Sequence, residues 1–102
     1  MKKDGNTTIL NFNDILMIRT EDNQVKIHTQ NNSYTINKRL YELENRLNND
    51  FIRISKSTIV NINEIDYVAP SFKGIMFISL KNGLKDNISR NYLPEFKKRL
   101  GL

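Results

Sequence analysis

Hydrophobic and polar residues alternate through most of this chain, and this period of two restricts the possible folds more than any other feature of the sequence. In a β-strand, successive side chains point to opposite faces, so alternation is typical of a strand with one buried face. Residues 24–29 alternate in this way, and residues 33–36 follow after the turn-forming residues 30–32, with Tyr34 and Ile36 on one face. The pattern therefore predicts a mainly β protein.

Short apolar-rich segments of the same kind recur along the chain and are separated by Asn, Asp and Gly, which favour turns. The expected strands cover residues 8–12, 14–19, 24–29, 33–36, 51–54, 58–61, 64–68, 74–80 and 84–88. Asn82-Gly83 lies between the last two, and Asn-Gly between strands is a strong signal for a tight hairpin. Residues 69–73, which include Pro70, are expected to form a loop.

Two segments have the period of a helix instead. Leu40, Leu43 and Leu47 follow the spacing i, i+3 and i+7, which predicts an amphipathic helix over residues 38–47 with Asn37 as its N-cap. A second helix is expected over residues 92–100, where an apolar residue recurs at the same spacing. Pro94 fits only in the first turn of a helix, which makes Asn91 the expected N-cap.

The length of 102 residues fits one domain. The longest uninterrupted apolar runs are four residues, 15–18 and 75–78, whereas a membrane-spanning helix needs about 20 apolar residues. No apolar segment follows the charged residues at the start of the chain, as it would in a secretory signal. We therefore expect a cytoplasmic protein that makes no contact with a membrane.

The residues that most enzymes and metal proteins use are scarce. The chain has no cysteine and one histidine, His28, which argues against disulfides, thiol catalysis and metal centres. The acidic residues mostly fall on predicted helices or turns, without a pattern that would pair two carboxylates. The glycines lack the spacing of a phosphate-binding loop. We predict that the protein is not an enzyme and binds no cofactor or metal.

The charge balance points to an anionic partner. Sixteen Lys and Arg residues against eleven Asp and Glu give a net charge of +5, with an isoelectric point of about 9.6, and such basicity is typical of nucleic-acid binding. Cations suit phosphates, while Arg, Asn and Gln can pair with base edges. Three interruptions between strands combine these residue types, at Asn23, Gln24 and Lys26, at Arg53, Ser55, Lys56 and Ser57, and at Ser89, Arg90 and Asn91. Solvated turns would have the same composition, so composition alone leaves both interpretations open.

One long string of residues resembles a known family. The string is Phe51-Ile52-Arg53-Ile54-Ser55-Lys56-Ser57-Thr58-Ile59-Val60-Asn61, followed by Ile65, by Asn82-Gly83 and by Ile88-Ser89-Arg90-Asn91-Tyr92. It resembles the signature of the LytTR-type DNA-binding domain of bacterial transcription regulators, and the resemblance covers nearly the whole chain. It implies a single domain over residues 1–102, with compact, layered antiparallel β-sheets, one or two short helices, and loops that enter successive major grooves.

The resemblance also implies roles for single residues. The base-contacting positions of the family fall on Asn23 or Gln24, on Lys56 and on Arg90. Where relatives have an amide at the middle position, this chain has Lys56, which suits guanine or a phosphate rather than adenine. The other loop residues expected to contact or position DNA are Lys26, Arg53, Ser55, Ser57, Ser89 and Asn91. The apolar members of the string are expected in the core, namely Phe51, Ile54, Ile59, Val60, Ile65 and Tyr92.

The implied partner is double-stranded DNA, at direct-repeat sites, with protomers that are monomeric in solution and pair on the DNA. Such domains usually follow a receiver domain, for which 102 residues leave no room.

Two functions other than DNA binding were considered. A small basic β domain could recruit an acidic protein partner through its sheet edges. RNA-binding sheets usually display aromatic residues on a strand face, and the sequence shows no close Phe/Tyr cluster of that kind.

Overall fold

The computed structural model describes residues 2–3, 6–7 and 10–102, with side chains from residue 10 onward. The strands are β1 (Lys2–Lys3), β2 (Asn6–Thr7), β3 (Met17–Glu21), β4 (Gln24–His28), β5 (Ser33–Ile36), β6 (Phe51–Ser55), β7 (Thr58–Asn61), β8 (Ile65–Pro70), β9 (Met76–Leu80) and β10 (Lys85–Ile88). The helices are α1 (Leu40–Glu44) and α2 (Leu93–Leu100), with short 3-10 turns η1 (Phe12–Asp14), η2 (Ile62–Glu64) and η3 (Phe72–Gly74). The prediction of a mainly β fold with two short helices is confirmed.

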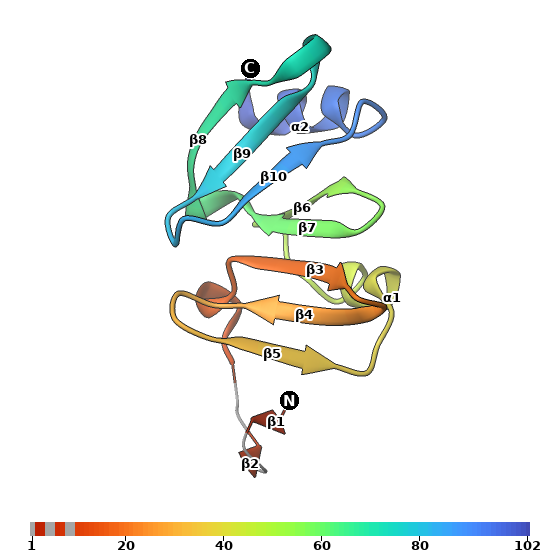
Figure 1. Cartoon of the computed structure of the whole chain (residues 1–102), viewed down its shortest axis with the longest axis vertical. Coiled ribbons are helices and arrows are strands. Elements are labelled where there is room, and N and C mark those ends of the chain that lie inside the picture. Colours follow the sequence, from red (N-terminus) through yellow and green to blue (C-terminus); the bar gives the residue numbers. More distant parts are fainter. Residues whose placement is uncertain (1, 4–5, 8–9) are drawn as a thin grey trace.

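Two antiparallel sheets form the body of the molecule. One has five strands in the order β5-β4-β3-β7-β6, and the other has three in the order β10-β9-β8, while β1 pairs only with β2. The three-stranded sheet lies next to the β6–β7 end of the five-stranded sheet, and α2 lies beside it (Figure 1). The chain thus forms layers, with neighbouring strands mostly joined by short hairpins.

Each face of the five-stranded sheet packs against a different hydrophobic layer. Phe96 of α2 is fully buried with Ile78 and Ile88 of the three-stranded sheet, against Met17 and Val60. On the other face, Leu40 and Leu43 of α1 lie in a second cluster together with Ile18, Ile27 and Ile59. Burying a side chain of this size stabilises the fold by roughly 1.5–3 kcal/mol. The two layers explain why residues 15–18 are all buried although they are consecutive.

The bounds of several elements differ from the prediction. Strand β8 continues through Pro70, where a loop was expected from residue 69, because β8 is an edge strand that needs no N–H from this residue. Helix α1 begins after Arg39 and not after Asn37, and Tyr92 rather than Asn91 precedes α2. Residues 12–14 form η1, where the expected strand over 8–12 was to end and the one over 14–19 to begin. Residues 8–9 of the first lie outside the described residues.

The signature residues expected in the core mostly lie there. Phe51, Ile54, Ile59 and Val60 are buried, whereas Ile65 and Tyr92 are only half-buried. Within the described parts of the chain, no helix is long and apolar enough to cross a membrane.

Candidate nucleic-acid interface

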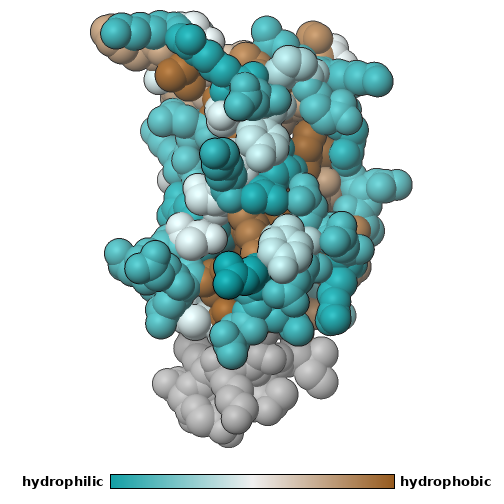
Figure 2. Space-filling model, turned by 90° about the vertical axis from the view of Figure 1, so that its right-hand side faces the viewer, coloured by the Kyte–Doolittle hydropathy of each residue, from teal (hydrophilic) through white to brown (hydrophobic). Residues whose placement is uncertain are grey.

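Three loops with polar tips lie on one side of the molecule. They are the β3–β4 turn, the β6–β7 loop and the β10–α2 loop, and they follow one another along the long axis on the right-hand side of Figure 1. The surface on that side is mainly hydrophilic, and hydrophobic residues show only in small areas between polar ones (Figure 2). The fold therefore places the three predicted base-contacting positions on the same side, although they are far apart in sequence.

The β3–β4 turn is shaped by its backbone. Asp22 and Asn23 both have positive φ angles, 50° and 63°, and Glu21 pairs with Gln24 across the turn. Two consecutive positive φ angles are typical of the tight turn that suits the twist of a β-hairpin, and Asn and Asp tolerate this conformation better than most residues. The side chains of Asn23 and Gln24 are exposed, so both amides are accessible at the tip.

The β6–β7 loop is held by Arg53. Its Nε donates to the carbonyl of Ser55 at 2.7 Å, its Nη2 to the carbonyl of Lys56 at 2.6 Å, and its Nη1 to Oε1 of Glu44 at 2.9 Å. The backbone N–H of Ser57 donates to the Ser55 hydroxyl at 3.2 Å. Arg53 is half-buried and Lys56 is exposed. All three nitrogens of the Arg53 guanidinium thus bind within the protein, and this presents the Lys56 ammonium at the tip.

The β10–α2 loop is attached to the sheet that carries the second loop. The N–H of Ser89 donates to the carbonyl of Ile54 in β6 at 2.9 Å, and the carbonyl of Ser89 accepts from the N–H groups of Tyr92 and Leu93 at the start of α2. Arg90 and Asn91 between these contacts are exposed. Nη2 of Arg90 donates to the carbonyl of Lys73 at 3.0 Å.

A polar network lies behind the first turn and links the two sheets. Oε2 of Glu21 accepts from Nε of Arg19 at 2.7 Å and from Nε2 of His28 at 2.8 Å. Nη1 of Arg19 also lies 3.5 Å from Oδ2 of Asp86, which accepts from the Thr58 hydroxyl at 2.8 Å. This network connects β3, β4 and β7 to β10 and so fixes the first turn relative to the third loop.

The same network shifts the acidity of one carboxylate. Partial burial alone would raise the pKa of Glu21, but the hydrogen bonds from Arg19 and His28 outweigh burial and lower this pKa below its ordinary value. The ammonium of Lys26 lies 3.9 Å from Oε1 of Glu21 and its side chain is partly buried. Lys26 is therefore placed within this network, set back from the tip of the turn.

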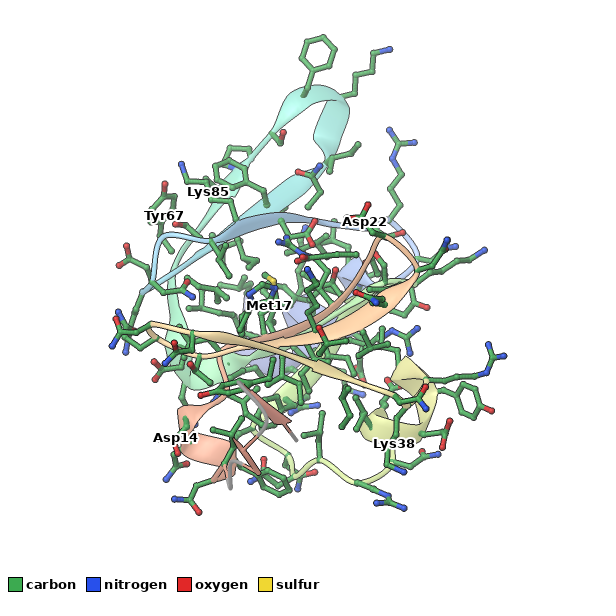
Figure 3. All side chains as sticks on the ribbon, turned by 60° about the horizontal axis from the view of Figure 1, so that its bottom comes forward. Asp14, Met17, Asp22, Lys38, Tyr67 and Lys85 are labelled. Atoms are coloured by element: carbon green, nitrogen blue, oxygen red, sulfur yellow. The ribbon has the colours of Figure 1, made fainter. Side chains whose placement is uncertain are left out.

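Two aromatic residues, Tyr67 and Phe77, lie together in the fold although the sequence shows no close Phe/Tyr cluster. The ring centroids of Tyr67 in β8 and Phe77 in β9 lie 6.1 Å apart in an edge-to-face arrangement, and the Lys85 ammonium lies 5.9 Å from the Phe77 centroid. In Figure 3, Tyr67 and Lys85 lie on the side of the molecule opposite to Asp22 of the first turn. The aromatic pair therefore does not belong to the surface formed by the three loops.

The described side chains contain no cluster of three or more His, Asp and Glu residues that could hold a metal ion. Arg19 and Asp86 were not predicted as parts of the site. Arg19 and Asp86 are separated by 67 residues, and no local pattern signals a contact over such a distance.

Similar proteins are found among bacterial regulators. The chain is 37% identical over 93 residues to the sensory transduction protein LytT of Bacillus subtilis (strain 168), a match covering 90% of this chain and 39% of LytT. It is 36% identical over 94 residues to an uncharacterized HTH-type transcriptional regulator of Staphylococcus aureus (strain NCTC 8325 / PS 47), with 92% and 64% covered. The chain thus spans less than two thirds of the length of each relative.

A solved structure has the same fold. It is the LytTr DNA-binding domain of a Bacillus cereus protein described as a methyl-accepting/DNA response regulator, with a TM-score of 0.91, 27% identity, and coverage of 99% of this chain and 94% of that one. Residues 5–101 match the family described as the LytTr DNA-binding domain. This family is not enzymatic, in agreement with the prediction from the sequence. The chain therefore belongs to the LytTr DNA-binding domain family, whose members are DNA-binding domains of bacterial transcription regulators.

Proposed function

We propose that residues 1–102 act as a single, sequence-specific domain for double-stranded DNA, whose three loops enter successive major grooves on one face of the duplex. The observation that carries this proposal is the row of three polar loops along one side of the molecule (Figure 1). Two of the three tips present an exposed cation, Lys56 or Arg90. Loops on a sheet framework can approach base edges without a recognition helix, because the strands and the helix that flank them fix where their tips lie.

In this proposal, three positions read base edges. Asn23 or Gln24 supplies an amide from the first turn, Lys56 an ammonium from the second loop, and Arg90 a guanidinium from the third. Arg and Lys pair with guanine O6 and N7, and an amide pairs with adenine. A well-formed bidentate contact discriminates against the wrong base by roughly 1–3 kcal/mol.

The remaining predicted residues have supporting roles in this proposal. Ser55, Ser57, Ser89 and Asn91 contact the phosphate backbone, since each lies in or beside a loop tip. Arg53 and Lys26 act from within the protein, because Arg53 holds the β6–β7 loop and Lys26 lies near Glu21. Phosphate contacts of this kind fix the register of the protein on the duplex but carry no sequence information directly.

The biological setting follows from the same proposal. The domain regulates transcription in a bacterium, acts in the cytoplasm where the DNA lies, and binds as a monomer that pairs with a second copy on direct-repeat sites. In relatives that are longer than this chain, such as LytT, further residues are available to couple DNA binding to a signal.

Selection from randomised duplexes tests the proposal. The purified 102-residue chain would be incubated with the pool at near-physiological salt, because phosphate contacts make affinity strongly salt-dependent. We expect an enriched site that binds far more tightly than scrambled DNA. Selection without enrichment would contradict the proposal and favour a module that recruits an acidic protein.

The variant Arg90→Ala then tests base reading. It is expected to lose discrimination at one base pair by roughly 1–3 kcal/mol. Lys98→Ala is the matched control, because Lys98 is an exposed cation in the last turn of α2. An equal loss on all sequences in Arg90→Ala would show that Arg90 contacts only phosphate.

A further inference from the structure

The tip of the β8–β9 hairpin reaches the third loop. Residues 71–75 form this tip, in which the N–H of Ser71 donates to the carbonyl of Ile75 at 2.6 Å. Lys73 has a φ of 57° and Gly74 a φ of 76°, and this left-handed turn directs the chain back into β9. The tip projects from the three-stranded sheet beyond the β10–α2 loop (Figures 1 and 3).

One hydrogen bond joins the tip to Arg90. The carbonyl of Lys73 accepts from Nη2 of Arg90 at 3.0 Å, across 17 residues of sequence. The Arg90 side chain is otherwise exposed, and a long exposed side chain has many rotamers, most of which are lost when it binds a base. The contact with the tip removes part of this freedom before DNA arrives.

The contact leaves Arg90 able to read a base. A guanidinium has five N–H donors in a rigid plane, and the Lys73 carbonyl uses one of them. The donors that remain include a pair along one edge of the plane, which is what recognition of guanine O6 and N7 needs. The carbonyl therefore restrains the guanidinium without blocking the group.

We propose that the β8–β9 tip is a positioning element that holds the Arg90 guanidinium, through the Lys73 carbonyl, in the orientation that reads its base pair. The inference rests on the proposed function, because it assumes that Arg90 contacts a base. Sequence preference at that base pair then depends on a backbone group in a hairpin that is separate from the three reading loops. Fixing a side chain in advance in this way raises affinity for the correct partner without any new contact to it.

A shortened tip tests the inference. Replacement of Phe72-Lys73-Gly74 by Asn-Gly puts a two-residue turn between Ser71 and Ile75, which are already hydrogen-bonded to each other. Thermal unfolding and circular dichroism would establish that the variant folds. The measured quantity is the ratio of affinities for the selected site and for the same site altered at the base pair that Arg90 reads. We expect this ratio to fall roughly 2- to 10-fold, the usual effect of releasing one ordered side chain.

Lys73→Asn is the matched control. Asn tolerates a positive φ, so this variant keeps the backbone carbonyl and removes the ammonium together with its contact to the Phe72 ring. It is expected to keep the affinity ratio of the unaltered protein. A loss as large as that of the shortened tip would overturn the assignment to the carbonyl.

The Arg90→Ala background supplies the second control. Shortening the tip in that background should leave the preference at this base pair unchanged, because the residue that the tip orients is gone. A further loss there would show that the tip acts on its own. If the unaltered protein selects a site and the shortened tip discriminates equally well, the inference fails while the proposed function stands. If the unaltered protein selects no site, the proposed function itself fails.

Discussion

The first turn and the second loop of the row are built in different ways. The β3–β4 turn takes its shape from two backbone angles, at Asp22 and Asn23, and the side chains at its tip are exposed. The β6–β7 loop takes its shape from one side chain, because Arg53 binds two of its carbonyls and Glu44. A substitution at the tip of the first turn therefore changes a side chain that is proposed to read a base. Substitution of Arg53 instead changes the position of the proposed reading residue Lys56, whose carbonyl it binds.

The largest effect is expected from Arg53→Ala. It removes three hydrogen bonds and leaves the Glu44 carboxylate without this partner, and Arg53 is mostly buried while Glu44 is exposed. Allowing for screening at the exposed end, we expect a loss of roughly 1–2 kcal/mol in the free energy of unfolding. DNA affinity should fall as well, because Lys56 is no longer held in place. Urea denaturation and titration with the selected duplex would measure the two effects.

Arg53→Lys sharpens this prediction. Lysine keeps the positive charge but cannot make the planar fork of contacts that arginine makes. We expect this variant to behave nearly like Arg53→Ala in both measurements. Full recovery of DNA affinity by lysine would mean that the charge at this position binds DNA directly. The loop would then not depend on the hydrogen bonds of the Arg53 guanidinium.

At the first turn, a loss of stability of similar size is expected from the backbone alone. Asn23→Val places a β-branched residue at a φ of 63°, which costs roughly 1–2 kcal/mol of stability. Asn23→Gly keeps the turn and removes only the amide. If Asn23 reads a base, Asn23→Gly loses preference at one base pair with unchanged unfolding. If the preference is unaffected, Asn23 does not read a base, and Gln24 is left as the predicted contact of this turn.

The smallest effect concerns the network behind the first turn. The pKa of Glu21 is lower in the folded protein, so its contribution to stability is complete above the unfolded pKa of roughly 4.3 and is lost as the pH falls through the folded pKa. Between neutral and acidic pH, we expect the free energy of unfolding of Glu21→Gln to fall by about 0.2–1 kcal/mol less than that of the unaltered protein. Unfolding curves between neutral and acidic pH would show it, and identical pH profiles for the two proteins would rule out the contribution of Glu21.

The features that the sequence predicted are those with a local signal. The alternation in residues 24–29 and 33–36 and the Asn82-Gly83 turn predicted hairpins that are present, because side-chain direction and turn conformation depend on near neighbours. Pro70 misled the prediction since an edge position is a property of the whole sheet. The N-caps also differ, by two residues at α1 and by one at α2, because local patterns do not fix the terminal residue of a helix.

Contacts between distant residues had no such signal. The positions proposed to read bases could be named in advance, because the resemblance to a family includes them. The groups that hold them could not, since the Arg19–Asp86 and Arg90–Lys73 contacts exist only once the sheets have assembled. The Tyr67–Phe77 pair was missed for the same reason, because its members lie on adjacent strands rather than adjacent in sequence.

Guanine N7 methylation of the selected duplex, with and without bound protein, tests most directly whether the row of loops enters successive major grooves. N7 lies in the major groove, so it is protected only where protein enters there. We predict clusters of protection on one face of the duplex, spaced about 10 base pairs apart. Tight, sequence-selective binding that leaves N7 unprotected would contradict this arrangement. Protection of guanines on all faces of the duplex would contradict it as well.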